Sequence, residues 1–292
     1  MNNSYCKPIS LSDWQLVKVS GIDNRTFMQG QITNDINQLN EHTALFAAHC
    51  DPKGRMWSNL ILFQRDKDIF YILRKSVAEK QVSALKKYSV FSKVIIEPVL
   101  DLNLIGLECG DVEQSIILDL IGKTCLTINN ITYIKIPLPE MRVIKVSSEP
   151  LPNNLQPTSY WLKSDLEAGY AIIDKPNIES LLPQACNLQH YNAISFNKGC
   201  YCGQEMVARA QFRGANNRGL YLLNGHSKTL PIIGDKLEYE LEGNWREGGQ
   251  VLAALKLDQN DAIYAQVVLA NGIDIETKFR VKNQPDSILN FN

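Results

Sequence analysis

Lys198-Gly199-Cys200-Tyr201-Cys202-Gly203-Gln204-Glu205 is the most informative stretch of this 292-residue sequence. Cys200 lies between two glycines, Lys198 stands two residues before it, and a helical pattern begins just after it. A cation and a helix N-terminus both favour the thiolate, which is the nucleophilic and metal-binding form of cysteine. The stretch therefore makes Cys200 and Lys198 candidate catalytic residues. From the residues alone a buried, structural thiol is the commoner meaning, because free cysteine is among the most buried residue types.

Cys202 forms a Cys-x-Cys pair with Cys200, a spacing that raises the question of a metal site. A metal centre normally needs three or four ligands, and no second cluster of cysteine or histidine has suitable spacing. His190 is the nearest histidine along the chain. The sequence therefore predicts no dedicated metal site. The seven cysteines, an odd number in a chain without a signal peptide pattern, favour reduced thiols over a disulfide framework.

Length and composition are those of a globular protein with two or three packed units. Hydrophobic residues make up 45% of the chain, charged residues 21%, and the formal net charge is -1. This charge predicts no bulk attraction to nucleic acid or to an anionic membrane. No apolar stretch approaches the roughly 18 residues needed to span a bilayer. We expect a cytoplasmic protein that does not associate with membranes.

The first third of the chain has the pattern of an α+β unit. A turn is predicted at 51–54, because Pro52 presets the backbone and Gly54 tolerates a positive φ. Ser76 and Glu79 have the spacing of a capping box at the start of a helix. Extended segments are expected at 14–19, 43–50, 56–63 and 69–73.

The remainder of the chain changes character twice. Residues 94–148 alternate β-rich runs with a helical pattern near 112–120, and the proline-rich segment 150–157 is a loop by composition. After Arg213, short alternating runs are separated by glycine, asparagine and aspartate. Such runs predict a small antiparallel barrel or sandwich.

Trp14, Trp161 and Glu167 form a second candidate site. A tryptophan beside a cleft can stack on a flat heteroaromatic ring, and a carboxylate can accept paired hydrogen bonds from an adjacent ring N–H and an exocyclic amine. A pterin presents these groups, so the combination suits folate. Each residue also has an ordinary structural interpretation, since tryptophans in strands are usually core and a glutamate before Ala168-Gly169 usually ends a solvated helix.

Residues 198–218 carry a local excess of positive charge. Four cations face one carboxylate in this segment, a net charge of +3. An anionic partner is compatible with this charge, and both the glutamate tail of a folate and an RNA phosphate would fit. A solvated helix face is the commoner meaning of such a run, and no aromatic-interleaved basic motif accompanies it.

The stretch 198–205 resembles the signature of the YgfZ family, relatives of the aminomethyltransferase (T-protein) of the glycine cleavage system. The resemblance extends over nearly the whole chain. Further matching segments are Ser12-Asp13-Trp14, the run from Met28 to Asp35, the run from His49 to Leu60, the run from Lys86 to Lys93, and the run from Pro183 to Gln189.

This resemblance implies an α+β, three-domain aminomethyltransferase-like ring that ends in an antiparallel β-barrel. The expected domains are 1–95, 96–212, which carries the cysteine motif, and 213–292. The resemblance also implies bound tetrahydrofolate, or a one-carbon derivative of it, and a role in the assembly or repair of iron-sulfur clusters. Expected partners are iron-sulfur client enzymes, including tRNA-modifying ones, or assembly proteins.

The family's functional residues transfer to this chain by position. Trp14 and Trp161 match the folate-binding tryptophans, Glu167 matches the glutamate of the aminomethyltransferase pterin pocket, and Cys200 matches the functional cysteine. These matches favour a functional role at all four positions. They identify folate as the expected cofactor and Cys200 as the expected reactive group.

Two departures from the pattern narrow the expected function. Ser58 and Asn59 stand where the aminomethyltransferase carries catalytic aspartates, so glycine-cleavage chemistry is not expected. Cys202 occupies a position where related signatures commonly have another residue, so no role is inherited there. Two alternatives remain: a folate-dependent methyl or aminomethyl transferase acting on an unknown substrate, and a module in which the segment 198–218 docks tRNA or a protein.

Overall fold

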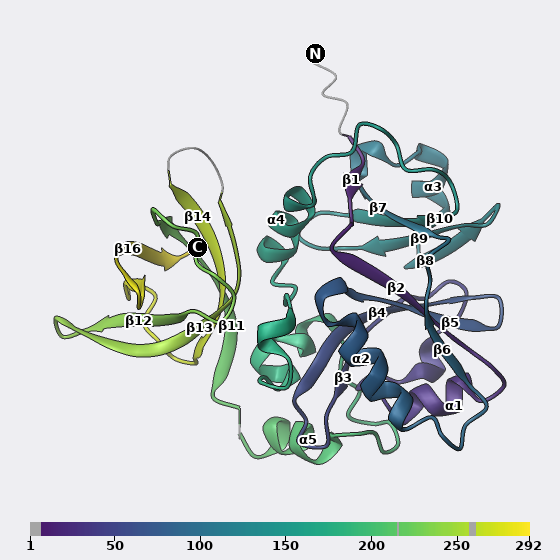
Figure 1. Ribbon diagram of the computed structural model, residues 1–292, viewed down its shortest axis with the longest axis horizontal. Helices are drawn as coiled ribbons and strands as arrows, with labels where there is room; N and C mark the ends of the chain where they lie inside the picture. Colours follow the sequence, from purple (N-terminus) through teal and green to yellow (C-terminus); the bar gives the residue numbers. More distant parts are fainter. Residues whose placement is uncertain (1–6, 215, 257–260) are drawn as a thin grey trace.

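The computed structural model describes residues 7–214, 216–256 and 261–292. Two five-stranded antiparallel sheets and one closed barrel make up its β-structure (Figure 1). Helices accompany the two sheets, and the barrel is formed by the C-terminal part of the chain. The expected α+β class with a C-terminal antiparallel barrel is therefore confirmed.

The first sheet has the strand order β3-β4-β5-β2-β6. Its helix α2 packs its apolar face onto a cluster of fully buried side chains that includes Leu60, Tyr71 and Leu85. The predicted turn is present, since Asp51 exchanges backbone hydrogen bonds with Arg55 and Gly54. The elements are β2 (Trp14–Ser20), α1 (Asn24–Gln29), η1 (Ile36–Gln38), β3 (Leu45–Cys50), β4 (Met56–Arg65), β5 (Asp68–Arg74), α2 (Lys75–Lys87) and β6 (Ile95–Pro98).

The start of α2 differs from the predicted capping box. The helix begins at Lys75, one residue earlier, and its N-cap Arg74 makes no side-chain cap hydrogen bond. The Ser76 hydroxyl instead donates to Asp174, which Arg74 also contacts at 3.0 Å. A long-range ion-pair network therefore replaces the local cap, and the capping-box prediction was wrong.

The second sheet has the order β1-β7-β10-β9-β8 and lies above the first in the view of Figure 1. A short helix at 114–119 confirms the helical pattern expected near 112–120. The sheet takes its edge strand from the N-terminal part of the chain, which then continues directly into the first sheet. The elements are β1 (Ile9–Ser10), β7 (Asn103–Glu108), η2 (Cys109–Asp111), α3 (Gln114–Asp119), β8 (Cys125–Ile128), β9 (Ile131–Ile136) and β10 (Arg142–Ser147).

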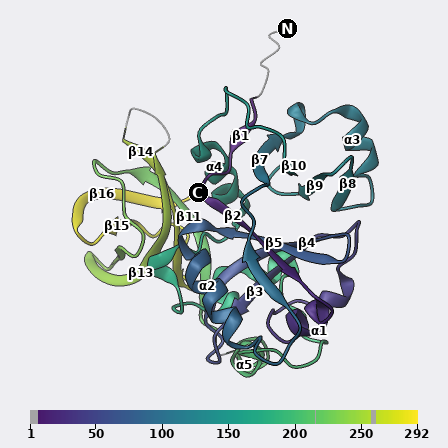
Figure 2. The ribbon, with the colours of Figure 1, turned by 45° about the vertical axis from the view of Figure 1, so that its right-hand side comes forward.

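The segment that follows the second sheet carries the cysteine motif and contains little regular structure apart from two helices. Figures 1 and 2 show α4 between the barrel and the sheets. The elements are α4 (Thr158–Ala168), η3 (Lys175–Asn177), η4 (Pro183–Cys186), η5 (Leu188–Tyr191) and α5 (Gln204–Phe212). This segment therefore places α4 between the barrel and the sheets (Figure 1), and it carries the cysteine loop against the first sheet, where Cys202 N donates to Gly30 O.

The barrel closes through β16, which pairs with β11. Gln266 on β14 fixes the junction, because its side chain accepts a hydrogen bond from Ile172 N at 2.9 Å and donates to Tyr170 O at 2.9 Å. The barrel strands are β11 (Arg218–His226), β12 (Lys236–Leu241), β13 (Asn244–Lys256), β14 (Ala262–Ala270), β15 (Phe279–Val281) and β16 (Gln284–Phe291). Among the described residues, no helix combines the length and apolar character that a membrane crossing requires.

Candidate functional site

The cysteine loop leads from η5 to α5 and exposes Cys200 to solvent. The loop is anchored where Cys202 N donates to Gly30 O at 3.1 Å, next to α1. Because Cys200 is exposed, it is not the buried structural thiol that the residues alone also allowed. The thiol is therefore accessible to a partner or a reagent from outside the protein.

Gly203 holds the loop against the first sheet. It has φ 83°, and a Cβ at this position would lie 2.5 Å from Asp51 O. Both the left-handed backbone and the close approach require glycine. The loop thus has a fixed attachment to the turn after β3, three residues beyond Cys200.

Lys198 is hydrogen-bonded to the backbone of α1 and of the segment that follows it. Its ammonium donates to the carbonyl oxygens of Gln29, Ile32 and Asn34 at 2.7, 2.8 and 2.7 Å. Burial lowers the pKa of Lys198 to about 8, against the raising effect of Asp35. Because an ammonium has three N–H groups, these bonds use its full donor capacity. The contacts give Lys198 a positioning role, and its predicted part in chemistry at Cys200 stays a prediction.

Cys202 is partly buried beside the end of α2. Its Sγ lies 3.9 Å from the hydroxyl of Tyr88, and burial raises the pKa of its thiol. Cys50 is near enough to contribute to the same electrostatic environment, and its pKa is also raised, mainly by burial. Raised pKa values disfavour thiolates. In residues 7–214, 216–256 and 261–292, no group of three or more His, Cys, Asp or Glu side chains could hold a metal ion.

Trp161 and Asp165 lie on the buried face of α4. Trp161 is 2% exposed, and its ring packs on Gly106 of β7 with the Arg142 guanidinium 4.3 Å from the ring centroid. Arg142 also pairs with Asp165 at 2.9 Å. The two helix residues are four positions apart, the spacing that places side chains on one helix face.

Three buried polar atoms around this ion pair lack a hydrogen-bond partner within the described chain: Asp165 Oδ2, Arg142 Nε and the hydroxyl of Tyr170. Burial raises the pKa of Asp165 to about 6, although Arg142 acts in the opposite direction. Burial also raises the pKa of Tyr170 well above its ordinary value. Unpartnered buried polar groups are uncommon in native structures, and a bound water or ligand is one way to satisfy them.

Aromatic rings enclose Tyr170. Its ring centroid is 6.1 Å from that of Trp14, and 5.6 Å from those of Phe46 and Tyr191. Arg74 lies 5.4 Å from the Trp14 ring. Trp14, Trp161 and Tyr170 belong to one buried hydrophobic cluster, which thus contains both tryptophans that the sequence identified. We call Trp14, Arg142, Trp161, Asp165 and Tyr170 the central cluster.

Glu167 lies outside this enclosure. It is on the exposed side of α4, where its carboxylate is 3.5 Å from the ammonium of Lys163. Six positions separate Glu167 from Trp161, which places the two on different faces of a helix with 3.6 residues per turn. Helix phase thus predicts that Asp165, and not Glu167, accompanies Trp161, and this signal was available in the sequence.

Ser58 and Asn59 are buried in β4 and serve the fold. The Ser58 hydroxyl donates to Asn59 O at 2.8 Å, and the Asn59 amide donates to Ala171 O at 2.7 Å. In the described chain Asn59 Oδ1 is buried without a partner, and the residue that its amide contacts, Ala171, directly follows Tyr170. A carboxylate pair is absent from these two positions.

A path of direct contacts connects the cysteine loop with the central cluster. Lys198 binds Asn34 O, and the Asn34 side chain donates to Phe46 O at 2.8 Å. The Phe46 ring then packs edge-on against Tyr170. The two regions that the sequence identified separately are therefore joined through the strand β3 and the segment that precedes it.

Comparison with solved structures defines the class of protein. The glycine cleavage system aminomethyltransferase T from Bartonella henselae superimposes with a TM-score of 0.72 at 13% identity, covering 98% of this chain and 84% of that one. The chain therefore has the aminomethyltransferase fold.

Sequence comparisons define the family. The YgfZ beta-barrel domain matches residues 216–284. Proteins called tRNA-modifying protein YgfZ are 42% identical over 291 residues in Yersinia pseudotuberculosis serotype IB (strain PB1/+) and 42% identical over 289 residues in Photorhabdus laumondii subsp. laumondii; each alignment covers 94% of this chain and 88% of the relative. The chain belongs to the YgfZ family.

Proposed function

We propose that this protein binds tetrahydrofolate, or a one-carbon derivative of it, in the central cluster and supports the assembly or repair of iron-sulfur clusters in client enzymes. The observation that carries the folate part is the group of unpartnered polar atoms on Asp165 and Tyr170 inside an aromatic enclosure. These residues suit a pterin, which offers paired N–H donors and a flat ring.

Specific residues would hold each part of the cofactor. The Asp165 carboxylate accepts hydrogen bonds from the pterin, and Arg142 keeps that carboxylate oriented through its 2.9 Å contact. Trp14 and Tyr170 provide the ring faces, and Trp161 supports Arg142 from the side of β7. Bound tetrahydrofolate supplies the ability to carry a one-carbon unit. Because the aromatic side chains pack against one another, entry of a pterin requires one of the rings to move.

The exposed thiol of Cys200 supports the iron-sulfur part of the proposal. Thiolates are the protein ligands of iron-sulfur clusters, so an accessible cysteine can contact a cluster or a client during repair. The contact path through Asn34 and Phe46 offers a route by which folate occupancy affects the cysteine loop. The relatives' name, tRNA-modifying protein, makes tRNA-modifying enzymes suitable candidate clients.

Complementation of cells that lack the endogenous protein tests this function. The wild-type chain should restore the activity of iron-sulfur enzymes, and Cys200→Ser should not. Cys109→Ser is the matched control, because Cys109 is also an exposed free cysteine but lies on η2. Full restoration by Cys200→Ser would remove Cys200 from the proposal, and failure of both variants would indicate a general loss of protein.

A folate-dependent one-carbon transferase is the second candidate, and Asp165 favours it. Its pKa of about 6 suits a general acid or base near neutral pH, a role that Ser58 and Asn59 cannot fill. Incubation of the protein with tetrahydrofolate and methylated or aminomethylated donors should then yield a one-carbon folate, and Asp165→Asn should abolish the product. Absence of product with all donors would exclude the transferase activity and retain only the folate-binding role.

A further inference from the structure

Two adjoining cavities lie beside the start of the barrel, one lined mainly by barrel strands and the other by α5, the turn after β3 and the segment that leads into β11. Their volumes are about 350 and about 560 Å³, and Leu181 and Arg218 line both. Each volume falls within the range of roughly 300 to 1,000 Å³ typical of ligand pockets. The two cavities adjoin at these shared residues, and we call their combined lining the basic cleft.

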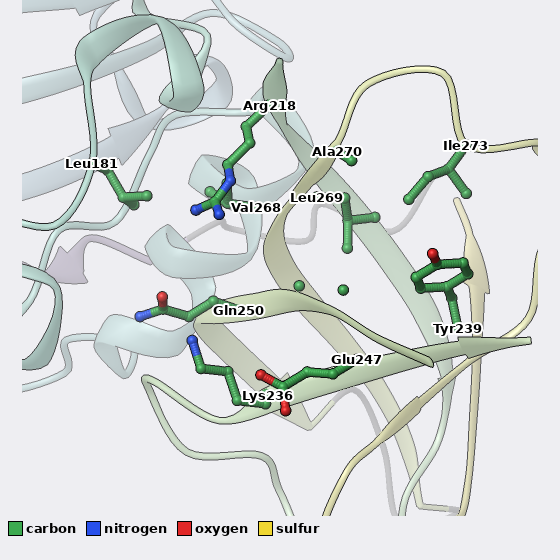
Figure 3. Close-up of a pocket in the computed structure, with 12 residues that line it drawn as sticks. Leu181, Arg218, Lys236, Tyr239, Glu247, Gln250, Val268, Leu269, Ala270 and Ile273 are labelled. Atoms are coloured by element: carbon green, nitrogen blue, oxygen red, sulfur yellow. The ribbon is translucent and has the colours of Figure 1, made fainter. Parts of the chain in front are cut away.

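Four cations line the basic cleft: Lys53 and Arg55 from the turn after β3, Arg218 at the start of β11, and Lys236 at the start of β12. All four are exposed. Figure 3 shows Arg218 reaching from β11 toward the side of the cavity where Gln250 and Lys236 lie. The cations therefore come from separate elements of the fold and line two adjoining cavities, with Arg218 lining both, in a protein with a formal net charge of -1.

The acidic residues of the basic cleft are neutralised by other cations. Glu205 pairs with Arg209 at 2.5 Å, and Glu247 pairs with Lys282 at 2.6 Å. Lys282 lowers the pKa of Glu247, and Lys236 contributes to the same effect. The four lining cations and these two partner cations make six positive charges, against the two carboxylates of Glu205 and Glu247. The lining therefore keeps an excess of positive charge.

One end of the cleft also offers an apolar and aromatic surface. Tyr239 lies against Gly248, where a Cβ would overlap its ring, and Leu269 and Ile273 line the same cavity. Sites for single-stranded nucleic acid combine two features: cations that bind the phosphate backbone and an aromatic ring on which a base stacks. Because the cations are divided between two adjoining cavities, they suit a chain of phosphates better than a compact anion.

We propose that the basic cleft binds single-stranded RNA, with Lys53, Arg55, Arg218 and Lys236 on the phosphates and Tyr239 beside a base. This site differs from the central cluster and from Cys200. It also differs from a docking helix in the segment 198–218, because Arg209 is paired and three of the four cleft cations lie outside that segment.

Fluorescence anisotropy of the full chain with a labelled oligouridylate of about 12 nucleotides tests the proposal. Four phosphate contacts predict that log affinity falls with log salt with a slope of about -3, since each contact on a single strand contributes roughly -0.7. Arg218→Ala and Lys53→Ala should each weaken binding by about fivefold or more at low salt and reduce the slope by about 0.7. Arg218→Lys should retain most of the affinity.

Lys228→Ala is the matched control, because Lys228 is an exposed barrel lysine that lines neither cavity and pairs with Asp286. It should leave binding unchanged. No binding at low salt would overturn the proposal, as would equal losses from Lys228→Ala and Arg218→Ala. Competition by ATP as effective as that by unlabelled RNA would also overturn it, and would assign the cleft to a small phosphate ligand. Circular dichroism of each variant verifies that it is folded.

Discussion

The affinity for folate should depend on pH through Asp165. The perturbation is a change of pH from 7 to 5, in the wild type and in Asp165→Asn. Burial raises the pKa of Asp165 to about 6, so this carboxyl group takes up a proton within the range. Only the ionised carboxylate can accept two hydrogen bonds from a pterin. Affinity is therefore retained above the pKa and lost as the pH falls through it.

The size of the effect follows from the ionised fraction. With a pKa of about 6, roughly ten elevenths of Asp165 is ionised at pH 7 and roughly one eleventh at pH 5. The apparent dissociation constant should thus rise about tenfold, or about 1.4 kcal/mol. The neighbouring tyrosines do not titrate in this range, because burial raises the pKa values of Tyr170 and Tyr191 further above neutrality.

Calorimetric titration with 5-formyltetrahydrofolate measures this dependence, since the formyl group removes the basic amine from the ligand's pterin. Asp165→Asn should bind more weakly at pH 7 and lose the tenfold change. Glu167→Gln is the matched control, since Glu167 lies on the exposed face of the same helix, and it should keep the wild-type profile. A wild-type affinity that is equal at both pH values, or a profile abolished by Glu167→Gln, would refute the assignment of the carboxylate.

Three substitutions test how the fold positions the cysteine loop and the central cluster. Gly203→Ala should destabilise the protein by about 1–3 kcal/mol, because Gly203 has a positive φ and contacts the turn after β3. It should also increase the reactivity of the adjacent Cys202 toward a thiol reagent. Gly199→Ala should do neither, because a Cβ at Gly199 meets open space. Gly106→Ala should cost about 1–3 kcal/mol in urea unfolding by displacing the buried tryptophan of α4, whereas Gly110→Ala should have little effect. Lys198→Met should cost more than about 2 kcal/mol, because three carbonyl groups lose a charged donor; an unchanged urea midpoint would contradict its positioning role.

Local patterns were sufficient to predict most elements. The expected strands at 14–19, 56–63 and 69–73 are observed at Trp14–Ser20, Met56–Arg65 and Asp68–Arg74. Alternation and turn residues act within a few positions, so they can be read directly from the sequence. The helix start at Ser76 failed because its hydroxyl binds Asp174, a residue 98 positions away that no local pattern reveals.

The candidate site shows the same division between local and long-range information. Exposure of Cys200 and burial of both tryptophans depend on packing between distant segments, and the motif alone left them open. The partners of Lys198 lie 164 to 169 positions before it, so its positioning contacts could not be derived from spacing. Asp165 was accessible to sequence reasoning, because helix phase alone places it with Trp161.

The crystal structure of this protein with 5-formyltetrahydrofolate tests the central claim most directly. We predict the pterin inside the central cluster, with its ring beside Trp14 or Tyr170 and its N–H groups within hydrogen-bond distance of Asp165. A pterin bound against Glu167 on the outer face of α4, or a central cluster left unchanged by saturating ligand, would contradict the account.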